Sequence, residues 1–165
     1  MIKSIKVLWN VQFEPRSGEK DRRTEGLAVH ISAKVDYGLR ALLVLAASDR
    51  PLTAREIAFR QGIPPRFLGA ILTDLRRGLV VTNRRGQDGG FQLARKSSSI
   101  TLAQVVGILE GPFAEIRGQR PEEFSYPGAA RHLCDVWATL RESIQSVLER
   151  MSLADVIEGR VPASP

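Results

Sequence analysis

The chain has 165 residues, 43% of them hydrophobic and 25% charged, which is the balance of an ordinary globular protein. This composition excludes a largely disordered chain. The single cysteine, Cys134, excludes an internal disulfide and a zinc site built from several cysteines. A formal charge of +6 favours a polyanionic partner, although a basic balance alone does not establish one.

The positive charge is concentrated in the middle of the chain. Residues 33–96 carry 12 basic and 5 acidic side chains, whereas residues 97–165 carry 6 and 9. This asymmetry is typical of a nucleic-acid-binding region joined to a different region, but chance distribution over a solvated surface explains it equally well. No stretch approaches about 18 uninterrupted apolar residues, so we expect no membrane span and a cytoplasmic protein.

Residues 1–28 are expected to form an extension outside the folded part of the chain. A short apolar patch near the start is interrupted by Lys6, Asn10 and Gln12, so it lacks the continuous apolar region of a secretion signal. The charged run that follows is typical of a linker or a disordered segment. We interpret residues 1–28 either as a disordered tail or as a misassigned start, with a valine-type start codon at Val29.

Two helices are predicted next. Apolar residues recur at three- and four-residue steps over residues 33–48, and Ser32 is a suitable N-cap for that helix. A shorter second helix begins with the capping box of Thr53 and Glu56 and ends before Gly62, which suits the left-handed position after a helix.

A third helix and a hairpin follow. Pro65 favours the first turn of a helix that ends at Gly78. The short apolar runs 79–82 and 91–93 are predicted to be strands joined by a turn-rich loop. Two short helices around a tight turn form a helix-turn-helix pattern, and a hairpin directly after it is a wing.

The C-terminal part is predicted to be helical. Thr101 caps a helix over residues 102–110, residues 113–128 form a loop, and a long amphipathic helix covers residues 129–150 before a last short turn capped by Ser152. The expected divisions are residues 1–28 (extension), 29–96 (winged helix-turn-helix), 97–128 (connecting helix and loop), 129–158 (long helix and C-terminal turn) and 159–165 (tail).

Several of these segments share their sequence pattern with one known family. They are HISAKVDYGLRALL (30–43), TAREIA (53–58), QGI (61–63), LRRGL (75–79), RGQDGGF (85–91), ITL to EGP (100–112) and the stretch from Trp137 to LAD (153–155). Together they resemble the Rrf2 family of bacterial transcription regulators, which includes the IscR and NsrR types, over residues 29–158. The resemblance implies a mainly α-helical fold with a small β-hairpin wing, a winged helix-turn-helix and a long C-terminal dimerisation helix.

The resemblance also implies a function. Such proteins are homodimeric repressors or activators of transcription that bind double-stranded DNA, and we expect a repressor on a near-palindromic promoter site. The alternative is a winged-helix module that binds only protein. Such a module has no need for Arg66, Arg84 and Arg85 together, so these residues favour DNA. We expect no enzyme, because Gly86–Gly90 lacks the strand–loop–helix context of a phosphate loop and no nucleophile motif is present.

The candidate DNA-binding residues lie at helix starts and in the wing. Arg66 can pair with guanine or grip a phosphate, and Phe67 either touches a thymine methyl or belongs to the core. An arginine beside Gly86 suits the narrow minor groove. The full set is Lys34, Tyr37, Thr53, Arg55, Pro65, Arg66, Phe67, Leu68, Arg84, Arg85, Gly86 and Gln87. Arg40 and Arg60 are equally well explained as solvated surface residues.

The long helix is expected to form the dimer interface with its apolar stripe. The stripe consists of Leu133, Val136, Trp137, Leu140, Ile144, Val147 and Leu148. Many members of the family hold an iron–sulfur cluster with three cysteines in the loop before this helix, but here that loop has none. We therefore expect no cofactor and no metal site. Cys134 is interpreted as a packing residue, with a redox thiol, or ligation helped by His30 or His132, as open alternatives. The effector is unknown.

Overall fold

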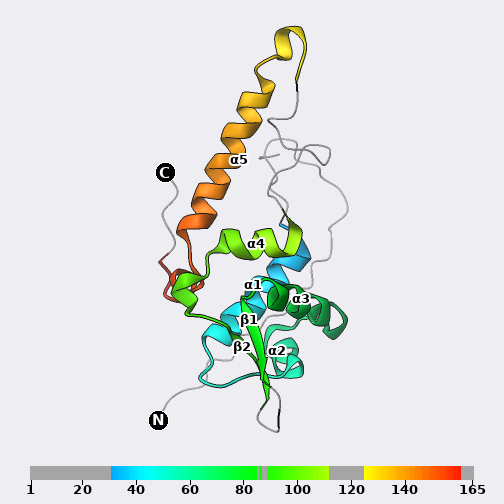
Figure 1. The fold of residues 1–165 in the computed structure, drawn as a ribbon, viewed down its shortest axis with the longest axis vertical. Coiled ribbons are helices and arrows are strands. Elements are labelled where there is room, and N and C mark those ends of the chain that lie inside the picture. Colours follow the sequence, from blue (N-terminus) through cyan, green and yellow to red (C-terminus); the bar gives the residue numbers. More distant parts are fainter. Residues whose placement is uncertain (1–30, 85, 87–88, 112–124, 161–165) are drawn as a thin grey trace, which may run out of the picture. The chain divides into compact units, whose positions relative to one another are not determined.

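The computed structural model describes residues 31–84, 86, 89–111 and 125–160, so the predictions for residues 1–28 and for most of the 113–128 loop lie outside it (Figure 1). In chain order the helices are α1 (Ala33–Ala46), α2 (Ala54–Gln61), α3 (Pro65–Arg77), α4 (Leu102–Glu110), α5 (Leu133–Arg150) and α6 (Leu153–Ile157). Strands β1 (Val81–Arg84) and β2 (Gly90–Leu93) lie between α3 and α4, and 3-10 turns cover Ser97–Ser99 and Gly128–Ala130. The mainly helical fold with one hairpin is confirmed.

The predicted starts of α1 and α2 are confirmed atom by atom. The Ser32 hydroxyl accepts a hydrogen bond from the Val35 amide at 3.2 Å. At α2 the Thr53 hydroxyl accepts from the Glu56 amide at 3.2 Å, while the Glu56 carboxylate accepts from the Thr53 amide at 2.8 Å. Gly62 ends α2 with φ +61°, a left-handed conformation that glycine adopts without steric cost. In the turn between α2 and α3, the Ile63 amide donates to the Ala58 carbonyl at 3.0 Å.

The capping box should make stability depend on pH. Hydrogen bonds from Arg50 and Thr53 hold the pKa of Glu56 at about 2, below its ordinary 4.5. The ionised carboxylate therefore stabilises the fold above pH 4.5, and this contribution is lost as the pH falls from 4.5 to about 2. Relative to wild type, Glu56→Gln is expected to lower the melting temperature more at pH 7 than at pH 3. An equal fall in melting temperature at both pH values would contradict a stabilising contribution from ionised Glu56. Glu142→Gln, on α5, is the control.

The transition from α3 to β1 differs from the prediction. The helix ends at Gly78 as expected, but the left-handed residue is Leu79, with φ +56°, and the first strand begins at Val81 rather than at residue 79. Gly78 is required by space, because a Cβ atom there would lie 2.5 Å from the Ile108 Cδ1 atom. The apolar run therefore contains a turn at Leu79 and a core residue, Val80, before the strand.

The hairpin is held to the helical part by a short third strand-like segment. β1 and β2 pair antiparallel, with Arg84 opposite Gly90. On the edge of β2 that faces away from β1, the Leu52 amide donates to the Phe91 carbonyl at 2.9 Å, and the Phe91 amide donates to the Leu52 carbonyl at 2.7 Å. A Cβ atom at Gly90 would lie 2.6 Å from the Leu52 carbonyl oxygen, so only glycine allows this close approach. The wing is thereby fixed against the segment that leads into α2.

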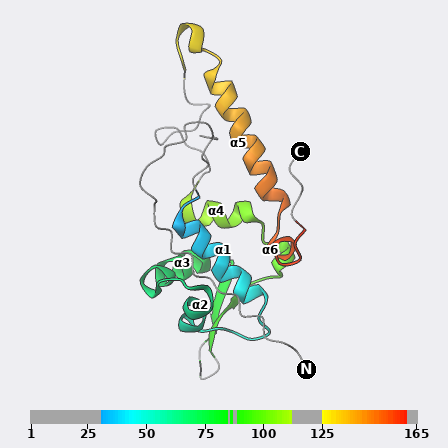
Figure 2. The same ribbon diagram turned by 180° about the vertical axis from the view of Figure 1, so that it is seen from behind.

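One apolar core joins α1, α2, α3, β1, α4 and α6. Its twelve largest fully buried side chains are Leu42, Leu52, Ile57, Leu68, Ile71, Leu72, Leu75, Val80, Val81, Ile100, Val105 and Leu153. α1 runs beside α3 and α4 in both views (Figures 1 and 2). A Cβ atom at Gly38 would lie 2.3 Å from the Leu109 Cδ1 atom, so a larger residue there would force the Leu109 side chain to shift.

The long helix α5 differs from the others in having no fully buried residue. It begins at Leu133, not at residue 129, because residues 128–130 form a separate 3-10 turn. Its contact with the rest of the fold is with α4, where the two helices line a groove of about 830 Å³ that includes Gly107, Arg141 and Leu148. Among the described residues, no helix is both long and apolar enough to cross a bilayer.

Candidate DNA-binding surface

Helix α3 divides into a buried face and an exposed face. Leu68, Ile71, Leu72 and Leu75 fill the core, whereas Pro65, Arg66, Phe67, Gly69 and Ala70 are exposed. Leu68 is 1% exposed and is the first core residue of the helix, so its burial argues against a contact of its side chain with DNA. The exposed first turn leaves room for a nucleic acid to approach.

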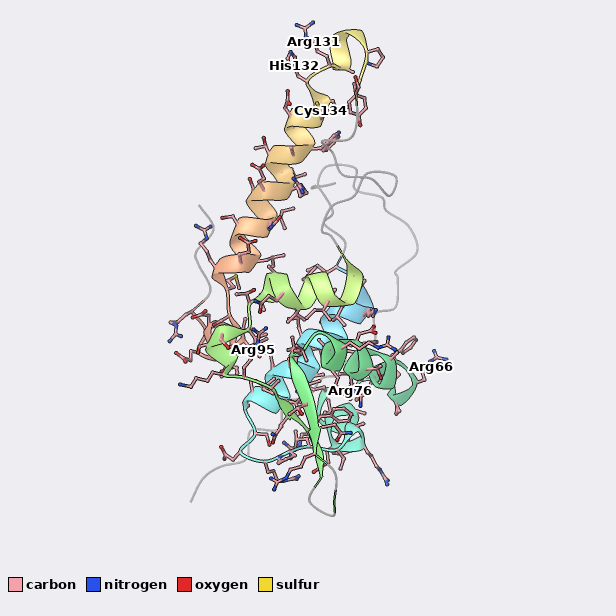
Figure 3. All side chains as sticks on the ribbon, viewed as in Figure 1. Arg66, Arg76, Arg95, Arg131, His132 and Cys134 are labelled. Carbon is pink, nitrogen blue, oxygen red and sulfur yellow. The ribbon has the colours of Figure 1, made fainter. Side chains whose placement is uncertain are left out.

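The first turn of α3 presents a cation over an aromatic ring. The guanidinium carbon of Arg66 lies 4.7 Å from the Phe67 ring centroid, which is a cation–π distance. Phe67 is 45% exposed, so it is neither a core residue nor fully solvated. Figure 3 shows Arg66 and Arg76 at opposite ends of α3. Within the described part of the chain, no carboxylate pairs with Arg66.

Helix α1 contributes an aromatic residue to the same region. The Tyr37 ring centroid lies 6.3 Å from that of Phe67, and the guanidinium carbon of Arg40 lies 5.7 Å from the Tyr37 ring centroid. Tyr37 is half-buried and packs against the core. Sequence reasoning placed Tyr37 in the DNA set but left Arg40 undecided. The spacing of one helical turn between residues 37 and 40 could have indicated Arg40, because it puts both residues on the side of α1 that faces α3.

The start of α2 and the wing carry the remaining predicted residues. Arg55 and Arg84 are exposed, and Gly86 is exposed with φ +117°. The Thr53 hydroxyl is occupied in the capping box, where it also donates to the Glu56 carboxylate at 2.9 Å. The predicted contacts of Arg85 and Gln87 lie outside the described residues.

Lys34 has a different environment from the one expected. Its ammonium nitrogen donates to the Leu109 carbonyl at 2.7 Å and lies 2.8 Å from the Asp74 carboxylate, so it joins α1, α4 and α3. The hydrogen bond from Lys34 lowers the pKa of Asp74. This geometry favours a structural role for Lys34 over the predicted phosphate contact.

Replacement of Lys34 distinguishes these roles. Lys34→Met keeps the aliphatic stem but removes both polar contacts, so the melting temperature is expected to fall while affinity for DNA is unchanged. Lys96→Met, at an exposed lysine after β2, is the matched control and should change neither quantity. Thermal melts and DNA titrations at one salt concentration measure both. If Lys34→Met keeps the wild-type melting temperature but binds DNA more weakly, the result would support the predicted phosphate contact of Lys34 instead.

The apolar stripe of α5 is largely uncovered in the single chain. Val136 is 56% exposed and Val147 is 44% exposed, and Leu133, Trp137, Leu140 and Ile144 are half-buried. Leu148 also packs against the core of its own chain. The stripe therefore has the apolar character of an interface.

The fold and this surface define a winged-helix DNA-binding protein: a helix-turn-helix, a hairpin directly after it, and an exposed cation on the first turn of the second helix of the motif. The particular family follows from comparison. Residues 31–159 match the Rrf2 family, described as iron-dependent transcriptional regulators, and the chain belongs to that family.

Named relatives and solved structures agree with this assignment. A Mycobacterium tuberculosis protein named as an HTH-type transcriptional regulator is 42% identical over 136 residues, which cover 81% of this chain and 84% of the relative. The structure of CymR, the global cysteine regulator of Bacillus subtilis, has a TM-score of 0.68 at 25% identity and covers 80% of this chain and 98% of its own. IscR of T. potens has a TM-score of 0.66 at 26% identity, covering 84% and 95%. The chain is a DNA-binding transcriptional regulator.

The residues of this chain do not fit a cysteine-held iron–sulfur cluster. The whole sequence has one cysteine, and the described residues contain no group of three or more His, Cys, Asp or Glu side chains that could hold a metal ion. The Cys134 sulfur lies 3.5 Å from the Arg131 carbonyl and 3.7 Å from the Asp135 carboxylate, and His132 hydrogen-bonds Asp135 at 3.2 Å (Figure 3). These contacts are local to the start of α5. A cluster held by three cysteines of one chain therefore cannot form here.

Proposed function

We propose that the protein is a homodimeric repressor that binds a near-palindromic promoter site. Residues 29–96 form the DNA-binding part, residues 129–158 the dimerisation part and residues 97–128 the connection between them. The observation that carries the proposal is Arg66, an exposed cation without a carboxylate partner among the described residues, on the first turn of α3. In helix-turn-helix proteins this turn enters the major groove. The protein acts in the cytoplasm, where bacterial DNA lies.

The uncovered stripe of α5 supports the homodimer. A second copy would present the same stripe, and two such stripes can cover each other about a twofold axis. Two copies of α3 then face two half-sites, which explains the expected palindrome. The name CymR describes a cysteine regulator in Bacillus subtilis, and nothing in the described residues of this chain identifies its own effector.

Selection from a random pool tests the function without knowledge of the operator. The full chain is mixed with duplexes that carry a randomised central region, and bound DNA is amplified through repeated rounds. We expect enrichment of one inverted repeat, here called the selected duplex, with affinity well above that for a scrambled duplex of equal composition. Binding of both duplexes with equal affinity would contradict sequence-specific regulation. A reporter gene behind the selected duplex, less active with the protein than without it, tests repression.

The wing is expected to contribute a backbone contact. Arg84→Ala should weaken binding to the selected and scrambled duplexes by a similar factor, because a phosphate contact carries no sequence information. It should also reduce the slope of log affinity against log salt by about 1 per protomer contact. Titrations at several salt concentrations measure this slope. An unchanged slope would remove Arg84 from the interface; Arg95→Ala, exposed after β2, is the control.

A further inference from the structure

Two arginines and two aromatic rings form a continuous row between α1 and the first turn of α3. The order is Arg40, Tyr37, Phe67 and Arg66. The Arg40 guanidinium carbon lies 5.7 Å from the Tyr37 ring centroid, and the Arg66 guanidinium carbon lies 4.7 Å from the Phe67 ring centroid. The two ring centroids are 6.3 Å apart. Each step lies in the range of an attractive cation–π or aromatic pair. The row therefore links the Arg66 guanidinium to a residue on another helix.

The α1 end of the row is held in place. Arg40 donates to the Asp36 carboxylate at 3.2 Å, and its Nη2 atom lies 3.9 Å from the position that a Cβ atom would take at Gly62, in the turn between α2 and α3. Tyr37 packs against the core, and its neighbour Gly38 is buried where α1 approaches α3. The packing of Tyr37 therefore limits the motion of its ring, whereas the Arg40 side chain is tied to Asp36 on its own helix.

The α3 end has few other constraints. Pro64, the N-cap of α3, makes no side-chain capping hydrogen bond, and Arg66 and Phe67 are both exposed. A free arginine side chain loses considerable rotamer entropy when it binds. Contact with Phe67 removes part of that freedom before any DNA arrives, which lowers the cost of binding.

We propose that Tyr37 and Arg40 are positioning residues for Arg66: through Phe67 they fix the guanidinium at the edge of α3 and so set the base preference that Arg66 imposes. This inference rests on the proposed DNA-binding function. Tyr37 acts through its ring, so the hydroxyl has no part in the mechanism. This positioning role therefore differs from a direct phosphate contact by Tyr37, because a phosphate contact would use the hydroxyl.

The test compares two substitutions of Tyr37 on the selected and scrambled duplexes. Tyr37→Leu is expected to weaken binding to the selected duplex by about 3- to 10-fold, the factor that one aromatic or cation–π contact supports, and to leave scrambled binding unchanged. Tyr37→Phe keeps the ring and should retain wild-type affinity for both. The control is Phe59→Leu, at an aromatic residue on α2 that is 89% exposed and outside the row.

A double-mutant cycle isolates the dependence on Arg66. If Tyr37 acts only through Arg66, then Tyr37→Leu has no further effect on selected binding in an Arg66→Ala background. Full additivity of the two losses would overturn the proposal, as would a loss in Tyr37→Phe as large as that in Tyr37→Leu. Arg40→Met should follow the same non-additive pattern. Cooperative thermal melts of each variant show that the fold is intact.

The outcomes separate the two hypotheses. If wild-type protein enriches no sequence from the random pool, the proposed regulatory function fails, whatever the variants do. If wild-type protein enriches an inverted repeat but Tyr37→Leu binds it with unchanged affinity, the function stands and the positioning role of the row is wrong.

Discussion

Arg66→Ala is expected to weaken binding to the selected duplex by about 10- to 100-fold, because one bidentate contact to a guanine supplies discrimination of that size. The guanidinium is exposed over Phe67, on the turn of α3 that faces outward, and no other described cation has this position. Binding to the scrambled duplex should change far less, since phosphate contacts elsewhere remain. Selected and scrambled affinities are measured by fluorescence titration at the same salt concentration.

The control for Arg66 is on the same helix. Arg76 is also exposed but lies at the C-terminal end of α3 (Figure 3). Arg76→Ala removes the same charge, so it reports any general electrostatic effect. Equal losses in the two variants would show that charge alone, and not base contact at the first turn, accounts for the effect of Arg66.

Val136→Glu combined with Val147→Glu is expected to convert the proposed homodimer to monomers. Both side chains are largely exposed in the single chain, and coverage by a second copy would bury the new carboxylates without partners, at a cost of several kcal/mol. Sedimentation at several protein concentrations measures the assembly. Loss of the dimer should also abolish tight binding to the inverted repeat, since two linked half-sites are bound far more tightly than one.

The control for dimerisation is on a side of α5 outside the apolar stripe. Ser146 is exposed, and at 100° per residue it lies about 160° from Ile144 and about 100° from Val147. Ser146→Glu adds one carboxylate to that face and should leave a dimer of wild-type affinity. If the Val136→Glu, Val147→Glu double variant remains a dimer, or if Ser146→Glu is a monomer, the interface lies elsewhere on the chain.

Much of the fold follows from short-range signals. The capping boxes of Thr53 with Glu56 and Thr101 with Gln104, the left-handed Gly62 and Pro65 at a helix start each act over a few residues, so the starts of α2, α3 and α4 are predictable. The strand start at Val81 was not predictable, because Leu79–Thr82 has the same apolar character as a strand of four residues. Only the packing of Val80 into the core shows where the turn ends.

The candidate site was predicted in part. The periodicity of α3 places Leu68 on the apolar face, where it is buried, but it could not decide whether Phe67 belongs to the core, and Phe67 is 45% exposed. Lys34 was assigned by its position at a helix start, whereas its partners Asp74 and Leu109 are distant in sequence. No local pattern can reveal a contact between residues 75 positions apart.

The sequence by itself determined the family, the helix-turn-helix and the concentration of positive charge in residues 33–96, because motif residues and charge do not depend on long-range packing. The lone cysteine likewise excludes a three-cysteine cluster held by one chain. Only the tertiary structure decided which cations are free to meet DNA. Lys34 is bound by its own chain, and Arg40, Tyr37, Phe67 and Arg66 form one row, because α1 packs closely beside α3.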